Sequence, residues 1–244
     1  MKQLSIFITT LGCSKNEVDS QVIVHKLQQE GFAFTNDVAV AQIIIINTCA
    51  FINVAKEEAL DTILQAITYK QNGECRWLVV CGCLAQRYGK SLEKLLPEVD
   101  LFLGVNAIAN INERITALIN KNLPKEFQIT KPTFLMNAKH QRVLPKPRHY
   151  AYLKIADGCD NKCSYCAIPQ IRGKYRSRPI NDIMEEARFL SSLGVKELII
   201  SAQDTTAYGK DLTAEQNIAT LLSNLSKLHD IHWIRLLYGH PARI

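Results

Sequence analysis

The stretch Ile43-Ile44-Ile45-Ile46, followed by Asn47-Thr48-Cys49, decides the fold. Four consecutive β-branched residues predict a strand that is buried on both faces, as in a parallel sheet covered by helices. Strand and helix patterns alternate around this run, which predicts a parallel, doubly wound α/β domain over residues 1–120. The expected strands cover residues 4–9, 43–46, 77–80 and 100–103, and the expected helices cover 16–30, 53–69, 92–96 and 107–119.

A second series of the same kind begins near residue 150. Residues 121–149 carry four prolines and no long apolar periodicity, so we expect a linker there. Beyond it, three strands and two helices predict part of a (β/α) barrel, because a complete eight-stranded barrel typically needs about 250 residues of its own. The expected strands are 150–156, 197–202 and 233–238, and the expected helices are 181–193 and 214–228.

Cys159, Cys163 and Cys166 form a Cys-x3-Cys-x2-Cys triplet at the start of this second series. Three thiolates this close together are typical of an iron–sulfur cluster, and without a fourth cysteine nearby one iron stays open to a substrate or cofactor. Zinc fits less well, since a zinc site usually takes four ligands and only His140 and His149 are near. A disulfide framework fits less well still, because eight cysteines in 244 residues is not the density of a small cross-linked domain.

Three further cysteines follow predicted strands of the first domain. Cys13, Cys49 and Cys83 each lie just past the carboxyl end of a predicted parallel strand, the edge at which open α/β sheets bind ligands. This placement favours a second three-cysteine cluster over three ordinary buried thiols, which are common near strands. We expect Cys81 to be a small apolar residue at a strand end and Cys75 to be a loop thiol.

Positive charge is concentrated in residues 121–178. The chain has a net charge of +6, and this segment holds 13 Lys and Arg against three acidic residues. The excess favours contact with RNA, but a solvated linker with structural arginines explains it equally well, because no aromatic interleaving is evident. The N-terminus lacks the apolar stretch of a secretory signal, and no segment is apolar for long enough to span a membrane. We therefore expect a soluble, cytoplasmic protein without a membrane partner.

The two cysteine triplets resemble those of the radical S-adenosylmethionine methylthiotransferase family. The loop 159–166 matches the radical-generating loop, in which Tyr165 also fits, and Cys13, Cys49 and Cys83 match the auxiliary-cluster ligands one by one. The similarity covers nearly the whole chain. Further matching motifs are Gly12-Cys13 with Asn16, Asp19 and Ser20, then Asn47-Thr48-Cys49, Gly82 to Gln86, Arg172-Gly173, and Ser177-Arg178-Pro179.

The resemblance implies two 4Fe–4S clusters, S-adenosyl-L-methionine and an external electron donor. In this family a radical made at the first cluster removes a hydrogen from the substrate, and a methylthio group carried by the auxiliary cluster takes its place. One branch modifies the β-carbon of an aspartate in the small-subunit ribosomal protein numbered twelve, and another modifies an adenosine of transfer RNA. Ser14-Lys15, residues 202–209 and residues 233–238 favour the ribosomal-protein branch.

Four further residues are candidates for contact with the cofactor: Tyr165, Gln203, Asp204 and Arg178. Gln203 and Asp204 follow a predicted barrel strand, although a turn in which Asp204 caps Thr206 explains the pair equally well. Arg178, like Arg172, has a guanidinium that matches a carboxylate of the cofactor or of an acidic substrate, and the alternative is a basic surface.

Family members continue through the rest of the barrel into a small β-rich domain. Neither part is present in these 244 residues, so we expect a chain that is truncated at its C-terminus, binds clusters poorly and turns over little. The alternative is a non-catalytic, cluster-binding remnant of a larger enzyme.

Overall fold

The computed structural model describes residues 3–121, 129–146 and 148–243. The chain forms two compact units, which divide between Phe134 and Leu135. The division falls inside the stretch 121–149 that the sequence predicts as a linker. Two of the prolines behind that prediction, Pro124 and Pro147, lie outside the described residues.

Parts of the predicted linker pack onto the units themselves. In the first unit, the side-chain amide of Gln86 donates to the carbonyl of Thr130 at 3.0 Å. In the second unit, Leu144 is buried in the hydrophobic core. Residues on both sides of the division are therefore held by their own unit.

The described residues of the first unit form a five-stranded parallel sheet in the order β2-β1-β3-β4-β5. The strand order reverses between β1 and β3, and this reversal is the topological switch point at which open α/β sheets bind ligands. All six residues of β3 are buried, which confirms the strand predicted at 43–46. The strands are β1 (Ser5–Thr10), β2 (Ala33–Phe34), β3 (Ile43–Thr48), β4 (Trp77–Gly82) and β5 (Leu101–Leu103).

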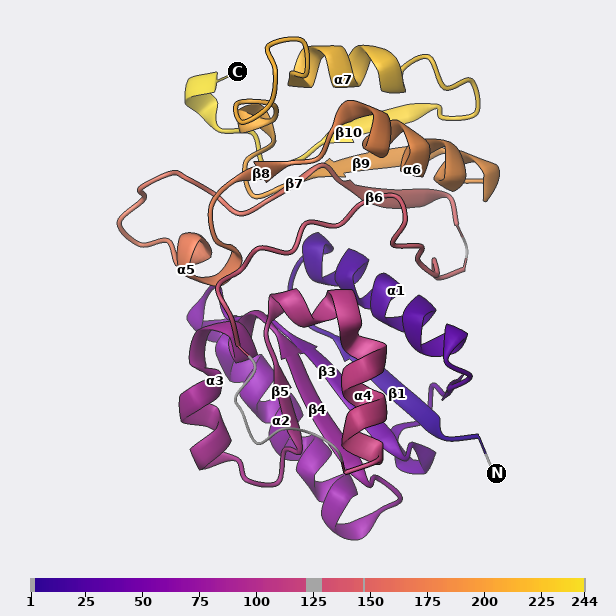
Figure 1. Ribbon diagram of the computed structural model, residues 1–244, viewed down its shortest axis with the longest axis vertical. Coiled ribbons are helices and arrows are strands. Elements are labelled where there is room, and N and C mark those ends of the chain that lie inside the picture. Colours follow the sequence, from indigo (N-terminus) through magenta and orange to yellow (C-terminus); the bar gives the residue numbers. More distant parts are fainter. Residues whose placement is uncertain (1–2, 122–128, 147, 244) are drawn as a thin grey trace. The chain divides into compact units, whose positions relative to one another are not determined.

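Helices cover both faces of this sheet, as the doubly wound prediction requires (Figure 1). Helices α1 and α4 pack against each other on one face, and α2 and α3 lie on the other. The helices are α1 (Ser14–Gln29), α2 (Asn53–Asn72), α3 (Cys83–Leu95) and α4 (Ile111–Ile119), with short 3-10 segments at Val38–Val40 and Val105–Asn110.

The sequence locates helix α3 only in part. The prediction covers residues 92–96, whereas the helix begins at Cys83, directly after β4. Gly89 in the helix interior weakens the local helix signal, because glycine is among the poorest helix formers. The amphipathic face formed by Leu84, Ala85 and Leu92 nevertheless buries the helix against the sheet.

The described part of the second unit contains a three-stranded parallel sheet in the order β10-β9-β6 and a small antiparallel pair of β7 with β8. This βαβ arrangement is that of a partial barrel. The predicted strand 150–156 is split, because the chain turns at Ile155 to pair Ala156 with Ser177. The strands are β6 (Tyr150–Lys154), β7 (Ala156–Asp157), β8 (Arg176–Ser177), β9 (Glu197–Ser201) and β10 (Trp233–Leu236).

Helices of the second unit pack on this sheet through an apolar core that includes Ile183, Leu190, Leu198 and Leu221. Helix α7 begins at Ile218, later than the predicted residue 214, because the Asn217 side chain accepts a hydrogen bond from the amide of Thr220 at 3.0 Å and caps the helix there. The helices are α5 (Ile168–Arg172), α6 (Ile180–Ser192) and α7 (Ile218–Leu225), with 3-10 segments at Thr205–Ala207 and Pro241–Arg243.

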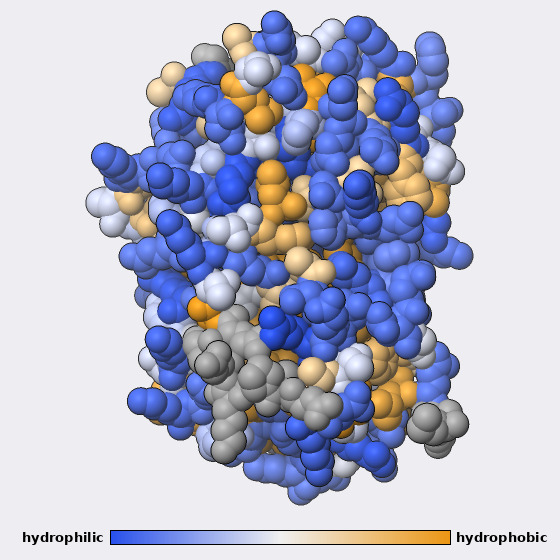
Figure 2. Space-filling view, viewed as in Figure 1, coloured by the Kyte–Doolittle hydropathy of each residue, from blue (hydrophilic) through white to orange (hydrophobic). Residues whose placement is uncertain are grey.

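Hydrophilic residues predominate on the face of the molecule shown in Figure 2. Within the described residues, no helix combines the length and apolar character needed to cross a bilayer.

Candidate functional site

The sheet of the first unit brings the carboxyl ends of three cysteine-bearing strands together. Cys49 follows the last residue of β3, and Cys83 follows the last residue of β4. Their predecessors Thr48 and Gly82 are register partners, so the two cysteines leave the sheet at the same level. Cys13 is the residue directly before helix α1, after β1, which is the other neighbour of β3. The three cysteines thus lie at one edge, and the switch point separates Cys13 from Cys49.

Two glycines allow the neighbouring loops to approach the end of β3 closely. Gly12 has a φ of +93°, and a Cβ placed on it would lie 2.5 Å from the Cβ and 2.9 Å from the Sγ of Cys49. Gly82 has a φ of +92°, and a Cβ there would lie 2.4 Å from the side-chain oxygen of Asn47. Only glycine suits both the backbone conformation and the space, so the loops before Cys13 and Cys83 are shaped by contact with the β3 end.

Neutral hydrogen bonds hold these loops in place. The Asn16 amide donates to the carbonyls of Leu11 and Thr48, both at 2.9 Å, and therefore ties the β1 loop to the β3 end. The Asn47 amide donates to the carbonyl of Asn16 and to Ser20 Oγ, also at 2.9 Å. Cys83 is part of the same network, because its Sγ lies 3.7 Å from the side-chain oxygen of Asn16.

All eight cysteines are free thiols, and Cys49 and Cys83 are buried while Cys13 is half-buried. Across residues 3–121, 129–146 and 148–243, no three His, Cys, Asp or Glu side chains lie close enough together to bind a single metal ion. The ligands of an iron–sulfur cluster bind separate irons and so lie farther apart than the ligands of one ion. The all-sulfur donor set fits a cluster better than a mononuclear site.

The two cysteines outside the predicted triplets are buried. Cys81 is the register partner of Asn47 within β4, and burial strongly raises the pKa of its thiol, with a further contribution from Asp19. Cys75 lies in the loop before β4, and burial raises the pKa of its thiol as well. Both remain protonated and apolar, as expected for Cys81; Cys75 lies in a loop as predicted.

In the second unit, the triplet lies on one loop between β7 and α5. Cys159 is buried, Cys163 is exposed and Cys166 is half-buried. The amide of Cys159 donates to the carbonyl of Gly173, and the amide of Cys166 donates to the carbonyl of Cys163, both at 3.1 Å. The loop is therefore closed at its base and turned at its tip, with Cys163 presented outward.

Asp157 anchors the base of this loop through a buried ion cluster. One carboxylate oxygen lies 2.7 Å from Lys154 Nζ and 3.4 Å from Arg172 Nη1. The other accepts from the amide of Gly158 at 2.9 Å and from the side-chain amide of Gln203 at 2.7 Å. Burial opposes the charge, but the Lys154 and Arg172 cations hold the pKa of Asp157 well below its usual range.

Gln203, a predicted cofactor contact, is oriented by this cluster. A carboxylate only accepts hydrogen bonds, so the Gln203 amide nitrogen must face Asp157. The Gln203 side-chain oxygen then points elsewhere, and it is buried without a hydrogen-bond partner among the described residues. A buried acceptor without a donor is costly, and a ligand with an N–H or O–H group would satisfy it.

Asp204, another predicted contact, lines a cavity of about 250 Å³ together with Cys159. Its carboxylate accepts from Thr206 Oγ1 at 2.7 Å and from the Asn161 amide at 2.9 Å, and it pairs with Arg243. Burial opposes ionisation, but these partners lower the pKa of Asp204. The predicted turn with Thr206 is therefore present, and it coexists with a position beside the cysteine loop.

The remaining two predicted contacts lie in contrasting surroundings. Tyr165 is 84% exposed at the tip of the cysteine loop. Arg178 is fully buried, and its guanidinium donates to Asp182 at 2.7 Å and to Glu186 at 2.5 Å. Arg172 is buried too, so the alternative of a basic surface is wrong for both arginines. Both arginines can be buried because carboxylates neutralise them. Strand and helix patterns in the sequence do not reveal these pairings.

Several residues of this region are absent from the sequence predictions. Lys154 is fully buried between Leu153 and Ile155, and a lysine within an apolar strand was a usable signal of a buried ion pair. Asn161 and Arg243 meet at Asp204 although they are far apart in the sequence. No local pattern indicates that meeting.

Comparisons with known proteins agree with this geometry. Residues 5–104 match the uncharacterized protein family UPF0004, and residues 153–235 match the radical SAM superfamily. The chain is 50% identical over 244 residues to the ribosomal protein uS12 methylthiotransferase RimO of Clostridium tetani, and 48% identical over 244 residues to that of Syntrophus aciditrophicus. These alignments include 99–100% of this chain but only 54% of each relative. The chain therefore spans about half the length of these relatives.

Solved structures support the fold. The radical S-adenosylmethionine methyltransferase TsrM from Kitasatospora setae, with cobalamin and a 4Fe–4S cluster bound, is similar with a TM-score of 0.60 at 13% identity. The match covers 84% of this chain and 50% of that one. The chain thus matches one family model on each of its two structural units, and along its whole length it is similar to uS12 methylthiotransferases that are about twice as long.

Proposed function

We propose that this chain is part of an enzyme that methylthiolates the β-carbon of an aspartate in ribosomal protein uS12. The observation that carries the proposal is the pair of three-cysteine sites, one on a single loop and one on three neighbouring strand ends. The relatives named as uS12 methylthiotransferases support this substrate over transfer RNA.

Cys159, Cys163 and Cys166 would hold one 4Fe–4S cluster, and Cys13, Cys49 and Cys83 the other. When bound, the first cluster supplies the electron that cleaves S-adenosyl-L-methionine, and the second supplies the sulfur that is transferred. The protein's own part is to position these groups. Asp157 fixes the base of the loop, and Gln203 offers an oriented acceptor beside it.

The contribution of the four proposed cofactor contacts differs. Gln203 has the free acceptor and Asp204 lies in the cavity with Cys159, so both are favoured. Tyr165 is accessible enough to cover a ligand at the loop tip. Arg178 already binds two carboxylates of α6, and its contact with the cofactor stays a prediction with less support.

The proposed partners follow from this chemistry. An external donor would supply the electron, because reductive cleavage of S-adenosyl-L-methionine consumes one. We propose that the enzyme binds the ribosomal protein in the cytoplasm, and that its basic segment 121–178 contacts RNA. No membrane partner is required.

The test is anaerobic reconstitution of the chain with iron and sulfide, followed by S-adenosyl-L-methionine and dithionite. Mass spectrometry should detect a methylthio group on recombinant uS12 and none on transfer RNA, with 5′-deoxyadenosine released, at a rate far below that of a full-length relative because the chain spans about half of such a relative. A full-length relative assayed in parallel sets the rate scale. Methylthiolated transfer RNA without modified uS12 would overturn the proposed substrate, and absence of 5′-deoxyadenosine from both proteins would overturn the reaction.

A further inference from the structure

The second unit has a basic pocket at the edge opposite its cysteine loop. The pocket has a volume of about 430 Å³ and is lined by Lys146, Arg148, His149, Leu193, Gly194 and Lys196. These residues precede β6 and β9 or end α6, whereas the cysteine loop and Gln203 follow the carboxyl ends of β6, β7 and β9. A ligand in the pocket would therefore leave the candidate cofactor site free.

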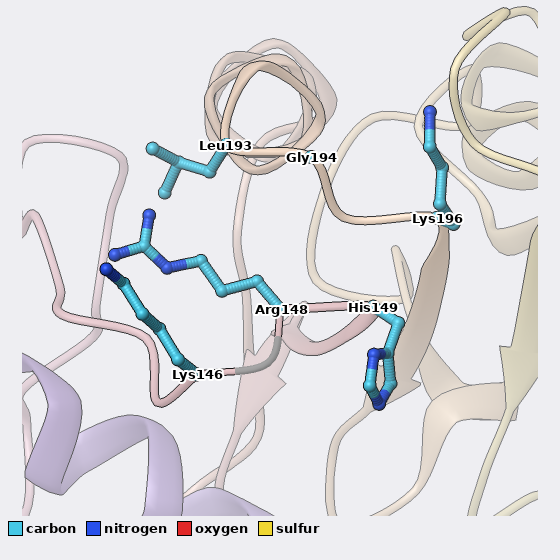
Figure 3. Close-up of a pocket in the computed structure, with 6 residues that line it drawn as sticks. All are labelled: Lys146, Arg148, His149, Leu193, Gly194 and Lys196. Atoms are coloured by element: carbon cyan, nitrogen blue, oxygen red, sulfur yellow. The ribbon is translucent and has the colours of Figure 1, made fainter.

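Two cations of this pocket converge without a counter-charge. In Figure 3 the side chains of Lys146 and Arg148 run side by side and end next to each other near Leu193, while Lys196 and His149 point elsewhere. In the part of the chain that the structure describes, neither Lys146 nor Arg148 has a carboxylate within ion-pair distance. The buried Nε of Arg148 also lacks a hydrogen-bond partner among those residues.

The buried arginines of the unit show what is missing here. Arg142, Arg172 and Arg178 are buried, and each pairs with a carboxylate. Arg148 is half-buried and has none. Two neighbouring cations repel each other, and an anion bound between them would relieve that repulsion.

The end of helix α6 does not supply that anion. Carbonyls at a helix C-terminus attract cations when they are unsatisfied. Here the amides of Leu193, Gly194 and Val195 already donate to the carbonyls of Phe189, Ser191 and Leu190. The two cations are not needed as caps.

An aromatic row leads out of the pocket. The ring of His149 lies 6.1 Å from that of Tyr150, which lies 5.9 Å from that of Tyr152. Tyr150 is 43% exposed. The sequence shows no aromatic interleaving with its charges, but the fold exposes Tyr150 next to His149, a residue that lines the pocket. Cations that bind phosphates next to aromatic rings that stack on bases are typical of single-stranded nucleic acid sites.

We propose that Lys146 and Arg148 bind backbone phosphates of single-stranded RNA, with Tyr150 stacking on a base. The choice of RNA rests on the proposed function, because a ribosomal-protein substrate is surrounded by RNA. RNA bound in this pocket would hold the enzyme near its substrate through the edge of the second unit that lies opposite the cysteine loop.

The test is a titration of the whole chain with a short fluorescein-labelled single-stranded RNA, read by anisotropy at several KCl concentrations. The double variant Lys146→Gln/Arg148→Gln should weaken binding about tenfold and lower the salt slope by about 1.4, which corresponds to two phosphate contacts at about 0.7 each. Tyr150→Leu should weaken binding about tenfold with an unchanged slope.

The matched control is Arg188→Gln/Lys227→Gln, which removes the same charge from exposed positions outside the pocket. Equal weakening by both double variants would show general electrostatic attraction and overturn the site. Displacement of the RNA by inorganic phosphate or polyglutamate at matched ionic strength would overturn RNA as the ligand. The titration needs no iron, cofactor or reductant, so its failure leaves the proposed reaction standing.

Discussion

The two cysteine sites are supported by different chemistry. In the first unit, neutral amides and a hydroxyl of Asn16, Asn47 and Ser20 tie the loop after β1 to the end of β3. In the second, buried charges around Asp157 hold one loop. Neutral hydrogen bonds contribute modestly and are insensitive to pH, whereas a buried ion cluster costs much to break and depends on protonation. The same kind of ligand set can thus be held by two supports that fail under different conditions.

The largest expected effect is on iron content. Replacement of Cys159, Cys163 and Cys166 by Ala should remove about half of the iron bound after anaerobic reconstitution, and replacement of Cys13, Cys49 and Cys83 should remove the other half, because each cluster binds through its own thiolates. Iron and sulfide assays with electron paramagnetic resonance measure this. Replacement of Cys75 and Cys81 is the control and should leave the iron unchanged. Loss of all iron from either triplet variant would show one shared site.

A comparison of two glycines in the second unit separates the cost of backbone strain from the cost of steric overlap. Gly158 has a φ of +81°, and a Cβ there would lie 2.1 Å from the carbonyl oxygen of Lys174. Gly158→Ala should lower the free energy of unfolding by about 3 kcal/mol, from strain and overlap together. Gly194, with a φ of +91° and open space around its Cβ position, is the matched control, and Gly194→Ala should cost about 1 kcal/mol. Equal losses in urea unfolding would contradict the packing argument.

The ion cluster is tested by Asp157→Asn. This change leaves Lys154 and Arg172 with less compensation in a buried place, and the free energy of unfolding should fall by about 3 kcal/mol. Glu197→Gln, which breaks the exposed pair with Arg235, should cost less than about 1 kcal/mol. Chemical denaturation followed by circular dichroism gives both values. A loss at Asp157 no larger than at Glu197 would mean that the cluster does not stabilise the loop.

The neutral network is tested by Asn16→Ala. Removal of the amide leaves the carbonyls of Leu11 and Thr48 without this donor, and a loss of about 2 kcal/mol is expected in the first unit. Asn112→Ala, which removes an exposed hydrogen bond to Glu30, should change stability by about 0.5 kcal/mol. Hydrogen exchange resolved by mass spectrometry assigns each effect to its unit. A response confined to the second unit would refute the assignment.

The smallest expected effect is the dependence of stability on acid pH, which should involve the ion cluster around Asp157 and not the neutral hydrogen bonds of the first unit. The pKa of Asp157 is lowered in the folded chain, so the unfolded chain takes up a proton below about pH 4 that the folded chain does not. The stability that Asp157 contributes is present above that pH and is lost as pH falls. The gap between the parent and Asp157→Asn should narrow by about 1.4 kcal/mol per pH unit below pH 4. A gap that stays constant from pH 5 to 3 would contradict the lowered pKa.

Much of the fold follows from local patterns, and the reasons are physical. The Ile43–Ile46 run and the alternation around it predict the parallel sheet, because burial on both faces requires apolar residues throughout. The ends of α3 and α7 are less predictable, since a mid-helix Gly89 and a capping Asn217 decide them locally. Short elements such as β2, β8 and α5 are set by tertiary pairing and have no signal of their own.

Some features of the candidate sites can be predicted from the sequence, and others cannot. The strand-end positions of Cys13, Cys49 and Cys83 can be predicted because the ends of parallel strands meet at one edge. The burial of Arg178 and the link between Asp157 and Gln203 cannot, because they join segments far apart in sequence through charges that any surface could carry.

The register of β3 and β4 also bears on how the protein matures. Cys49 and Cys83 become neighbours only after two strands separated by the whole of α2 have paired. Such long-range pairing comes late, because the intervening loop must be closed first. Residues 159–166, in contrast, already form a complete set of ligands in a short peptide. Iron could therefore find the second ligand set even in an unfolded chain, and the first only once its sheet has closed.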